Sequence, residues 1–341
     1  MKRATEGVGE GSLNGTGAGV ILEPIPTKPC PARRVSGWIP ILLAMVLLEG
    51  CSVRKLAVSK MADALAGGGG TFASDDDPDL IRAAIPFSLK LMESLLAESP
   101  SHKGLLLATA SGFTQYGFAF VQQDAEQIEE NDLDAAIALR ARAKRLYLRA
   151  RNYGLRGLEA THPGFGKALK ENPGRAAGLA RKGDVALLYW TASAWAAAIS
   201  ISKDQELLGD LPAVEALIDR GLTLDESFGN GSIHSFLISY EMVRQGATGE
   251  PWQRARKHFD RAVELSQGGQ AGPYVAYAES VSIPREDRAE FEKLLGQALA
   301  IDPDKRPEWR LANLIYQRRA RWLLDRVDKL ILGSTNDPSG N

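Results

Sequence analysis

Apolar residues recur along most of this chain at steps of three and four, the spacing that places side chains on one face of an α-helix. The pattern is clearest in residues 80–95, 136–150 and 311–323, where leucine, alanine and aromatic residues are interspersed with charged ones. Runs that alternate apolar and polar residues one by one, as half-buried β-strands do, are nearly absent from the sequence. The hydrophobic pattern therefore predicts an all-α protein.

Helix-breaking pairs separate these periodic segments and predict where helices stop. They are Ser99-Pro100, His162-Pro163-Gly164, Asn172-Pro173, Gly229-Asn230-Gly231, Gly268-Gly269 and Asp302-Pro303. Asp77 followed by Pro78 predicts a helix start, because aspartate caps free N–H groups and proline is tolerated in the first helical turn.

Three of the expected helices end in similar residues, at 222–226, 262–266 and 298–303, and these endings lie about 36 to 40 residues apart. This spacing suits tetratricopeptide-like helical hairpins, in which small residues let paired helices approach closely. Residues 125–210 fit no repeat register, so a helical bundle without true repeats is the alternative. We expect tetratricopeptide-like helical hairpins packed as a compact solenoid.

The apolar run at residues 38–48 is a different kind of segment. It follows Arg33-Arg34 and ends in Leu48-Glu49-Gly50-Cys51, which has the form of a lipobox. The run is too short for a transmembrane helix, which needs ~20 apolar residues. We therefore expect cleavage after Gly50 and lipidation of Cys51, and Ser52 favours sorting of the lipoprotein to the outer membrane.

These features divide the chain into four parts: a leader at residues 1–51, a flexible tether at 52–76, a helical domain at 77–334 and a disordered tail at 335–341. The tether is predicted from the four glycines at 67–70, which are costly to order. The only cysteines are Cys30 and Cys51, and Cys30 lies in the leader, so a processed chain has no internal disulfide.

Composition and motifs argue against catalysis. The formal net charge of −1 gives no footprint for nucleic acid. The four histidines have no metal-ligand spacing, and the sequence contains neither a Gly-x-Ser-x-Gly elbow nor a phosphate-binding loop. We therefore predict no enzyme activity, no cofactor and no metal site.

The basic stretch at residues 306–329 contains Arg318, Arg319 and Arg321, but Asp325 and Asp328 follow them. A nucleic-acid surface would need a more uniform positive charge. We interpret the stretch as a terminal helix with one face on the preceding hairpin and a charged face in water.

Two groups of aromatic residues are candidates for a ligand site: Phe113, Tyr116 and Phe120 in one segment, and Tyr189, Trp190 and Trp195 in another. The first three share a helix face, and the second three lie in an alanine-rich segment that allows close helix contact. Packing in the core explains both groups, and an apolar ligand cleft is the alternative.

Four stretches of this sequence resemble the TatT component of TRAP transporters, the tripartite ATP-independent periplasmic carriers. They are YGFAFV at 116–121, RLYLRARNYG at 145–154, LYWTASAW at 188–195 and RLANLIYQRRARWLL at 310–324. The resemblance covers most of the chain after Cys51.

The resemblance implies a lipid-anchored periplasmic accessory protein made of tetratricopeptide-like hairpins and assembled as a homotrimer. It also implies docking to the periplasmic solute-binding protein of a TRAP transporter, and apolar channels able to pass a hydrophobic small molecule to that partner. A tetratricopeptide scaffold lipoprotein for cell-envelope assembly is the alternative function.

Overall fold

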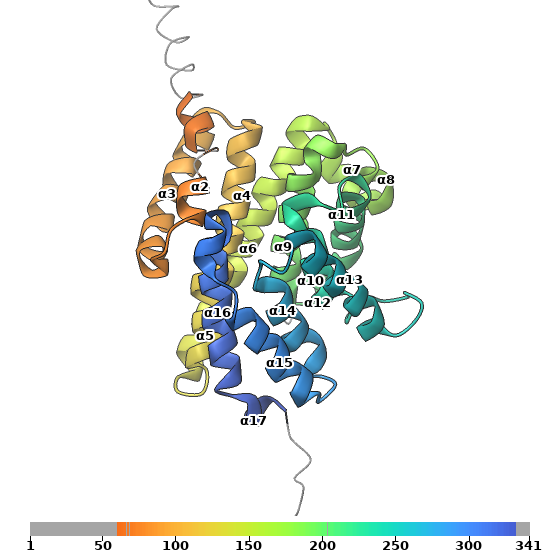
Figure 1. Cartoon of the computed structure of the whole chain (residues 1–341). Helices are drawn as coiled ribbons and strands as arrows, with labels where there is room; N and C mark the ends of the chain where they lie inside the picture. Colours follow the sequence, from red (N-terminus) through yellow and green to blue (C-terminus); the bar gives the residue numbers. More distant parts are fainter. Residues whose placement is uncertain (1–59, 66, 68, 203, 332–341) are drawn as a thin grey trace, which may run out of the picture. The chain divides into compact units, whose positions relative to one another are not determined.

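The computed structural model describes residues 60–65, 67, 69–202 and 204–331, all of which belong to one unit of the chain. These residues form helices joined by short turns, without a β-strand among them, which confirms the all-α prediction (Figure 1). The predicted leader with Cys51 and the predicted tail at 335–341 lie outside the described residues.

The helices of the first half follow the predicted periodic segments. In chain order they are α2 (Gly69–Ala73), α3 (Pro78–Glu98), α4 (Lys103–Gly117), the π-helical turn η1 (Phe118–Gln122), α5 (Gln123–Ile128) and α6 (Leu133–Thr161). The middle of the chain forms α7 (Phe165–Glu171), α8 (Pro173–Ala177), η2 (Lys182–Asp184), α9 (Val185–Ser200), α10 (Gln205–Leu208) and α11 (Leu211–Leu224).

The last third of the chain contains the remaining helices. Its elements are η3 (Phe228–Asn230), α12 (Ser232–Tyr240), α13 (Pro251–Ser266), α14 (Gly272–Tyr277), the π-helical turn η4 (Ala278–Ser282), α15 (Arg288–Leu299), η5 (Pro303–Lys305), η6 (Pro307–Trp309), α16 (Arg310–Leu324) and α17 (Val327–Leu330). The three repeated endings fall at the C-terminal ends of α11, α13 and α15.

The predicted helix boundaries have the expected local chemistry. Oδ1 of Asp77 accepts hydrogen bonds from the backbone N–H groups of Asp79 and Leu80, both at 3.0 Å, at the start of α3. Asn172 caps α8 in the same way, through the N–H of Arg175 at 3.0 Å. Gly231 has a φ of 100°, which only glycine adopts without strain, and it lets the chain turn from η3 into α12.

Helix α6 is the longest element and packs against both α4 and α9, which also touch each other. Its buried face carries Ala143, Tyr147 and Ala150, none of which is exposed to solvent. The small side chains allow the close approach of helices that the alanine-rich pattern predicted.

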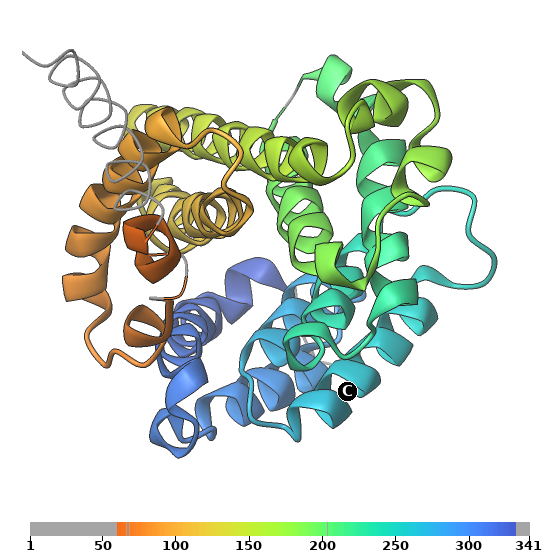
Figure 2. The same ribbon diagram turned by 90° about the horizontal axis from the view of Figure 1, so that it is seen from above.

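The final long helix, α16, returns to the beginning of the described chain. It contacts α2 and α3, and its residue Ile315 belongs to the same hydrophobic cluster as Ile81 and Phe113. Figure 2 shows the C-terminal helices, in blue, beside the N-terminal helices, in orange. In an open solenoid each hairpin touches only its neighbours. This contact instead makes the helical body compact, as expected, and the solenoid arrangement itself stays a prediction.

Helical packing also begins before Asp77. Residues 60–65 are helical, and the fully buried Ala62 lies in a cluster with Leu96, Leu105 and Leu106. Phe72 of α2 packs against the cluster that contains Ile81. Part of the segment predicted as a tether is therefore in contact with the helical body.

Gly154 marks the closest approach of α6 to α9. A Cβ atom at this position would stand 2.1 Å from Oγ1 and 3.3 Å from Cα of Thr191. We expect Gly154→Ala to lower the free energy of unfolding by about 1–3 kcal/mol, because the two helices must separate. Urea unfolding measures this loss.

The control is Gly296→Ala on α15, where the new Cβ would have no heavy atom within 4 Å. That variant should gain about 0.5–1 kcal/mol, since alanine favours the helix. Equal effects of the two substitutions would contradict the close-contact explanation.

Candidate functional site

Among the lysines and arginines of the described residues, Arg319 on α16 is the most buried, at only 8% exposed. Its Nε and Nη2 donate to the two carboxylate oxygens of Glu279 at 2.7 and 2.6 Å, and its Nη1 donates to Glu126 at 2.7 Å. Burial alone would lower the pKa of Arg319, but the two carboxylates raise it. We call Arg319, Glu126 and Glu279 the Arg319 clamp.

Both carboxylates of the clamp are placed by π-helical turns. Glu279 lies within η4, and Glu126 follows η1 on α5, where it accepts a hydrogen bond from Gln122 at 2.9 Å. A π-turn rotates the side chains that follow it relative to a regular helix, and such turns are frequent at functional sites. Arg318 donates to the backbone carbonyl of Ala119 in η1 at 3.0 Å, so α16 holds this turn at a second point.

Two tyrosines contact the π-turn η1 next to the clamp. Tyr147 is fully buried and donates to Gln122 at 2.7 Å, while the ring of Tyr316 lies 5.8 Å from that of Phe118. Burial raises the pKa of both tyrosines, so both remain protonated at neutral pH. The clamp has one cation between two carboxylates, and its ion pairs join α5, η4 and α16.

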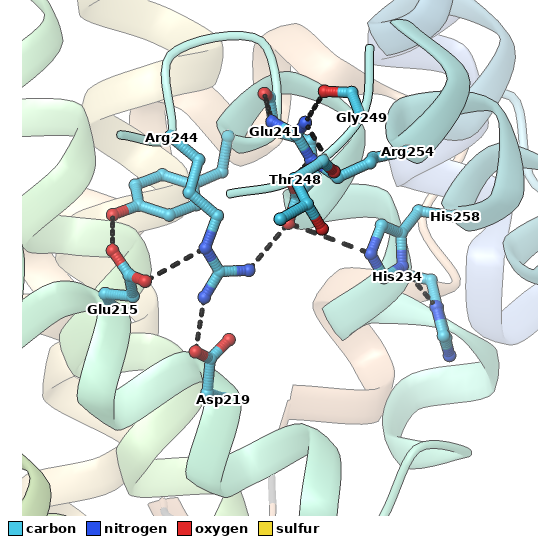
Figure 3. Close-up of polar contacts among 10 residues, drawn as sticks. Glu215, Asp219, His234, Glu241, Arg244, Thr248, Gly249, Arg254 and His258 are labelled. Carbon is cyan, nitrogen blue, oxygen red and sulfur yellow. Dashed lines mark hydrogen bonds and ion pairs between the residues drawn. The ribbon is translucent and has the colours of Figure 1, made fainter. Parts of the chain in front are cut away.

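A second polar group links α11, α12 and α13 (Figure 3). The carboxylate of Glu241, 2% exposed, accepts hydrogen bonds from Arg244 and Arg254, both at 2.6 Å. Arg244 also pairs with Glu215 and Asp219 of α11, and Arg254 donates to the backbone carbonyl of Gly249 at 2.6 Å. Although burial raises the pKa of Glu241, the bonds from the two arginines lower it overall.

Two histidines extend this group between α12 and α13. The Nδ1 atoms of His234 and His258 are 2.9 Å apart, a distance that requires one imidazole to donate and the other to accept. Burial lowers the pKa of both, and the neighbouring His234 helps to bring that of His258 to about 4. Both rings are therefore neutral at pH 7.

The described residues contain no group of three or more histidine, cysteine, aspartate or glutamate side chains that could hold a metal ion. Across the same ranges, no helix is both long and apolar enough to cross a membrane. Both polar groups pair buried charges and so join helices that are far apart in the sequence.

The six candidate aromatic residues fall into two neighbouring environments. Phe113, Tyr116 and Phe120 are buried in the cluster between α3, α4 and α6, where the ring of Tyr116 lies 5.8 Å from that of Phe120. Trp195 is buried in the cluster between α9 and α11 and donates to Asp210 at 3.1 Å.

Tyr189 and Trp190 are half-buried on the same helix, with ring centroids 5.0 Å apart. Helices α4 and α9 are in contact, so the two groups belong to adjacent helices but to different clusters.

The arginines of α16 do not form the water-facing row that the basic stretch suggested. Arg319 points inward to the clamp, Arg318 is half-buried against η1, and only Arg321 is exposed. The interpretation of this helix as charged on its outer face is wrong for Arg319, because two carboxylates from other helices compensate its buried charge.

The fold and the clamp define an all-helical protein whose hairpins are closed by its last long helix. The chain belongs to the TRAP transporter T-component family, whose family model matches residues 74–331. The match makes the chain a component associated with TRAP transporters, as the resemblance to TatT implied.

A similar protein comes from Treponema pallidum (strain Nichols). It is 29% identical to this chain over 306 residues, which cover 84% of this chain and 95% of the relative, and it is described as an uncharacterized protein. The similarity therefore extends over nearly the whole relative.

Proposed function

We propose that this chain is a lipid-anchored periplasmic accessory protein that docks the solute-binding component of a TRAP transporter. The observation that carries the proposal is the family match, which spans residues 74–331 and so includes almost the whole described helical body. The lipobox at Cys51 supports the anchor, and the array of helical hairpins offers an extended surface for a protein partner.

The anchor is tested by Cys51→Ser. We expect the variant to leave the membrane fraction or to keep its leader, because the thiol that would carry the lipid is absent. Wild-type protein should stay in membranes washed with high salt, since several acyl chains anchor firmly where one does not. Metabolic labelling with a fatty acid identifies the modified species, and a labelled Cys51→Ser protein would refute the anchor.

Docking is tested by crosslinking wild-type cells and identifying the proteins captured with this chain. A solute-binding protein among them supports the proposal, and its absence beside captured envelope-assembly proteins supports the scaffold alternative.

Light scattering of a chain that begins at Lys60 tests the proposed homotrimer, and a monomer at micromolar concentration would contradict it.

A hydrophobic ligand is the finer part of the proposal. The half-buried Tyr189 and Trp190 on α9 would contact an apolar small molecule with their aromatic faces. The buried Phe113, Tyr116, Phe120 and Trp195 would contribute to the same apolar site.

We expect Trp190→Ala to weaken binding of a fluorescent apolar probe about tenfold, the effect of losing one aromatic contact. Its stability should change less than that of Leu188→Ala, the control, because Leu188 is fully buried on the same helix and Trp190 is not. Probe titration and thermal melting separate the two effects. Unchanged probe binding by Trp190→Ala would remove this residue from the ligand proposal.

A further inference from the structure

The described chain enters the helical body at one particular end. Asp63 lies 3.1 Å from His102, the residue that caps the start of α4, and Ala62 is buried beside Leu105. Cys51 precedes Lys60 by nine residues, and a chain of that length spans at most roughly 30 Å. A lipid on Cys51 would therefore keep this end of the body close to the bilayer.

The same end carries a concentration of positive charge. Residues 163–183, which we call the basic segment, include α7, α8 and the start of η2. Five cations of this segment are exposed and its only acidic residue is Glu171, whereas the whole chain has a net charge of −1. The exposed cations are Lys167, Lys170, Arg175, Arg181 and Lys182.

Side-chain contacts place the basic segment beside the entry point of the chain. Lys103, next to the cap residue His102, donates to the backbone carbonyl of Gly183 at 3.4 Å and to Asp184 at 2.6 Å. Arg156, near the end of α6, donates to the carbonyl of Pro100 at 3.0 Å. Figure 1 shows α7 and α8 at the same end as the first described helix, and Figure 2 views the body from that end.

Most of these cations are available to a partner. In the described ranges, Lys170, Arg175 and Arg181 form no side-chain ion pair. Lys167 pairs with Glu171 at 3.8 Å and Lys182 with Asp225 at 3.7 Å, both long distances, and the two lysine side chains stay largely exposed. Leu179, which is 50% exposed, adds an apolar side chain between Arg175 and Arg181. Exposed cations beside an apolar residue are typical of segments that rest on a lipid surface.

We propose that the basic segment docks on the anionic phospholipid headgroups of the membrane that holds the anchor. This proposal rests on the lipid anchor of the proposed function, because electrostatic attraction to a membrane acts only within about one Debye length of its surface. The anchor supplies the proximity, and the cations orient the body with α7 and α8 towards the bilayer. An acidic protein partner could also bind the exposed cations of the basic segment. Such a partner would not explain why the basic segment lies at the end of the body where the chain enters.

The test uses the full chain as its cells produce it, solubilised with detergent and placed on two kinds of vesicle: phosphatidylcholine alone, and phosphatidylcholine with phosphatidylglycerol. Vesicle flotation reports the anchor, and hydrogen–deuterium exchange reports the docking surface. We expect amides of the basic segment to exchange about tenfold more slowly on the anionic vesicles. High salt should abolish the difference.

A charge-reversal variant, Lys170→Glu with Arg175→Glu and Arg181→Glu, should lose this protection while it still floats with both vesicles. The matched control reverses three exposed cations elsewhere, Lys257→Glu with Lys293→Glu and Arg321→Glu on α13, α15 and α16, and should keep the protection. Circular dichroism of both variants checks that the helices remain folded.

The outcomes separate the two proposals. Flotation with both vesicles but no difference in protection overturns the docking surface and leaves the anchor. Flotation with anionic vesicles alone overturns the anchor and leaves the surface, and flotation with neither overturns both. If the charge reversal removes capture of a solute-binding protein while vesicle protection is unchanged, the segment is a protein interface and the membrane proposal is wrong.

Discussion

Arg319→Ala is expected to lower the free energy of unfolding by about 3–5 kcal/mol, the usual loss when one partner of a buried ion pair is removed. The substitution leaves the carboxylates of Glu126 and Glu279, which are 20% and 24% exposed, without their shared cation. It also releases α16 from α5 and η4. Urea unfolding followed by circular dichroism measures the loss.

Two comparisons isolate the clamp. Arg321→Ala on the same helix removes an exposed cation and should change stability by less than about 0.5 kcal/mol. Replacing all three residues together, as Arg319→Met with Glu126→Leu and Glu279→Leu, should recover much of the loss, because no unpaired charge remains buried. A small effect of Arg319→Ala, equal to that of Arg321→Ala, would show that the clamp does not hold the helices together.

The fold class could be predicted from the sequence because its signals are local. Asp77 caps α3, Asn172 caps α8 and the Gly229-Asn230-Gly231 turn ends before α12, as the residue types require. Each of these contacts joins residues only a few positions apart, so pattern and turn chemistry are sufficient to place the helix ends.

The closure of the helices by α16 could not be predicted in this way. Arg319 binds Glu126, 193 residues earlier in the chain, and no local pattern reports such a pair. One signal was nevertheless present: Arg319 is four residues from the buried Ile315 and four from the buried Leu323, so it lies on the helix face that packs inward. The helical periodicity places residue 319 on the buried face, but a charged arginine is not expected there.

The histidine pair was missed for a related reason. His234 and His258 are 24 residues apart on two helices, a separation that no local metal-ligand spacing covers. Their contact depends on how α12 packs against α13. The aromatic residues show the same limit, because Phe113 and Trp195 are both buried but in clusters that sequence alone does not separate.

Acid is expected to destabilise the folded protein through this pair. Burial, together with the neighbouring His234, lowers the pKa of His258 from its ordinary value of 6.5 to about 4, so the unfolded chain binds a proton that the folded chain does not. Stability is therefore complete above pH 6.5 and falls as the pH decreases towards 4. His258 alone should account for a loss of about 2 kcal/mol between about pH 7 and about pH 5, at about 1.4 kcal/mol per pH unit.

His258→Gln should flatten this dependence, because glutamine has no group that titrates in the range and its amide can still hydrogen-bond His234. Urea unfolding at several pH values compares the two slopes. Burial would raise the pKa of Asp184, but its hydrogen bonds, first that from Lys103, lower the pKa to about 2. Asp184 therefore loses its contribution to stability only as the pH falls below 3.8, and so it does not affect the comparison. Parallel slopes for wild type and His258→Gln would contradict a buried, neutral His258 and would assign the acid sensitivity to carboxylates.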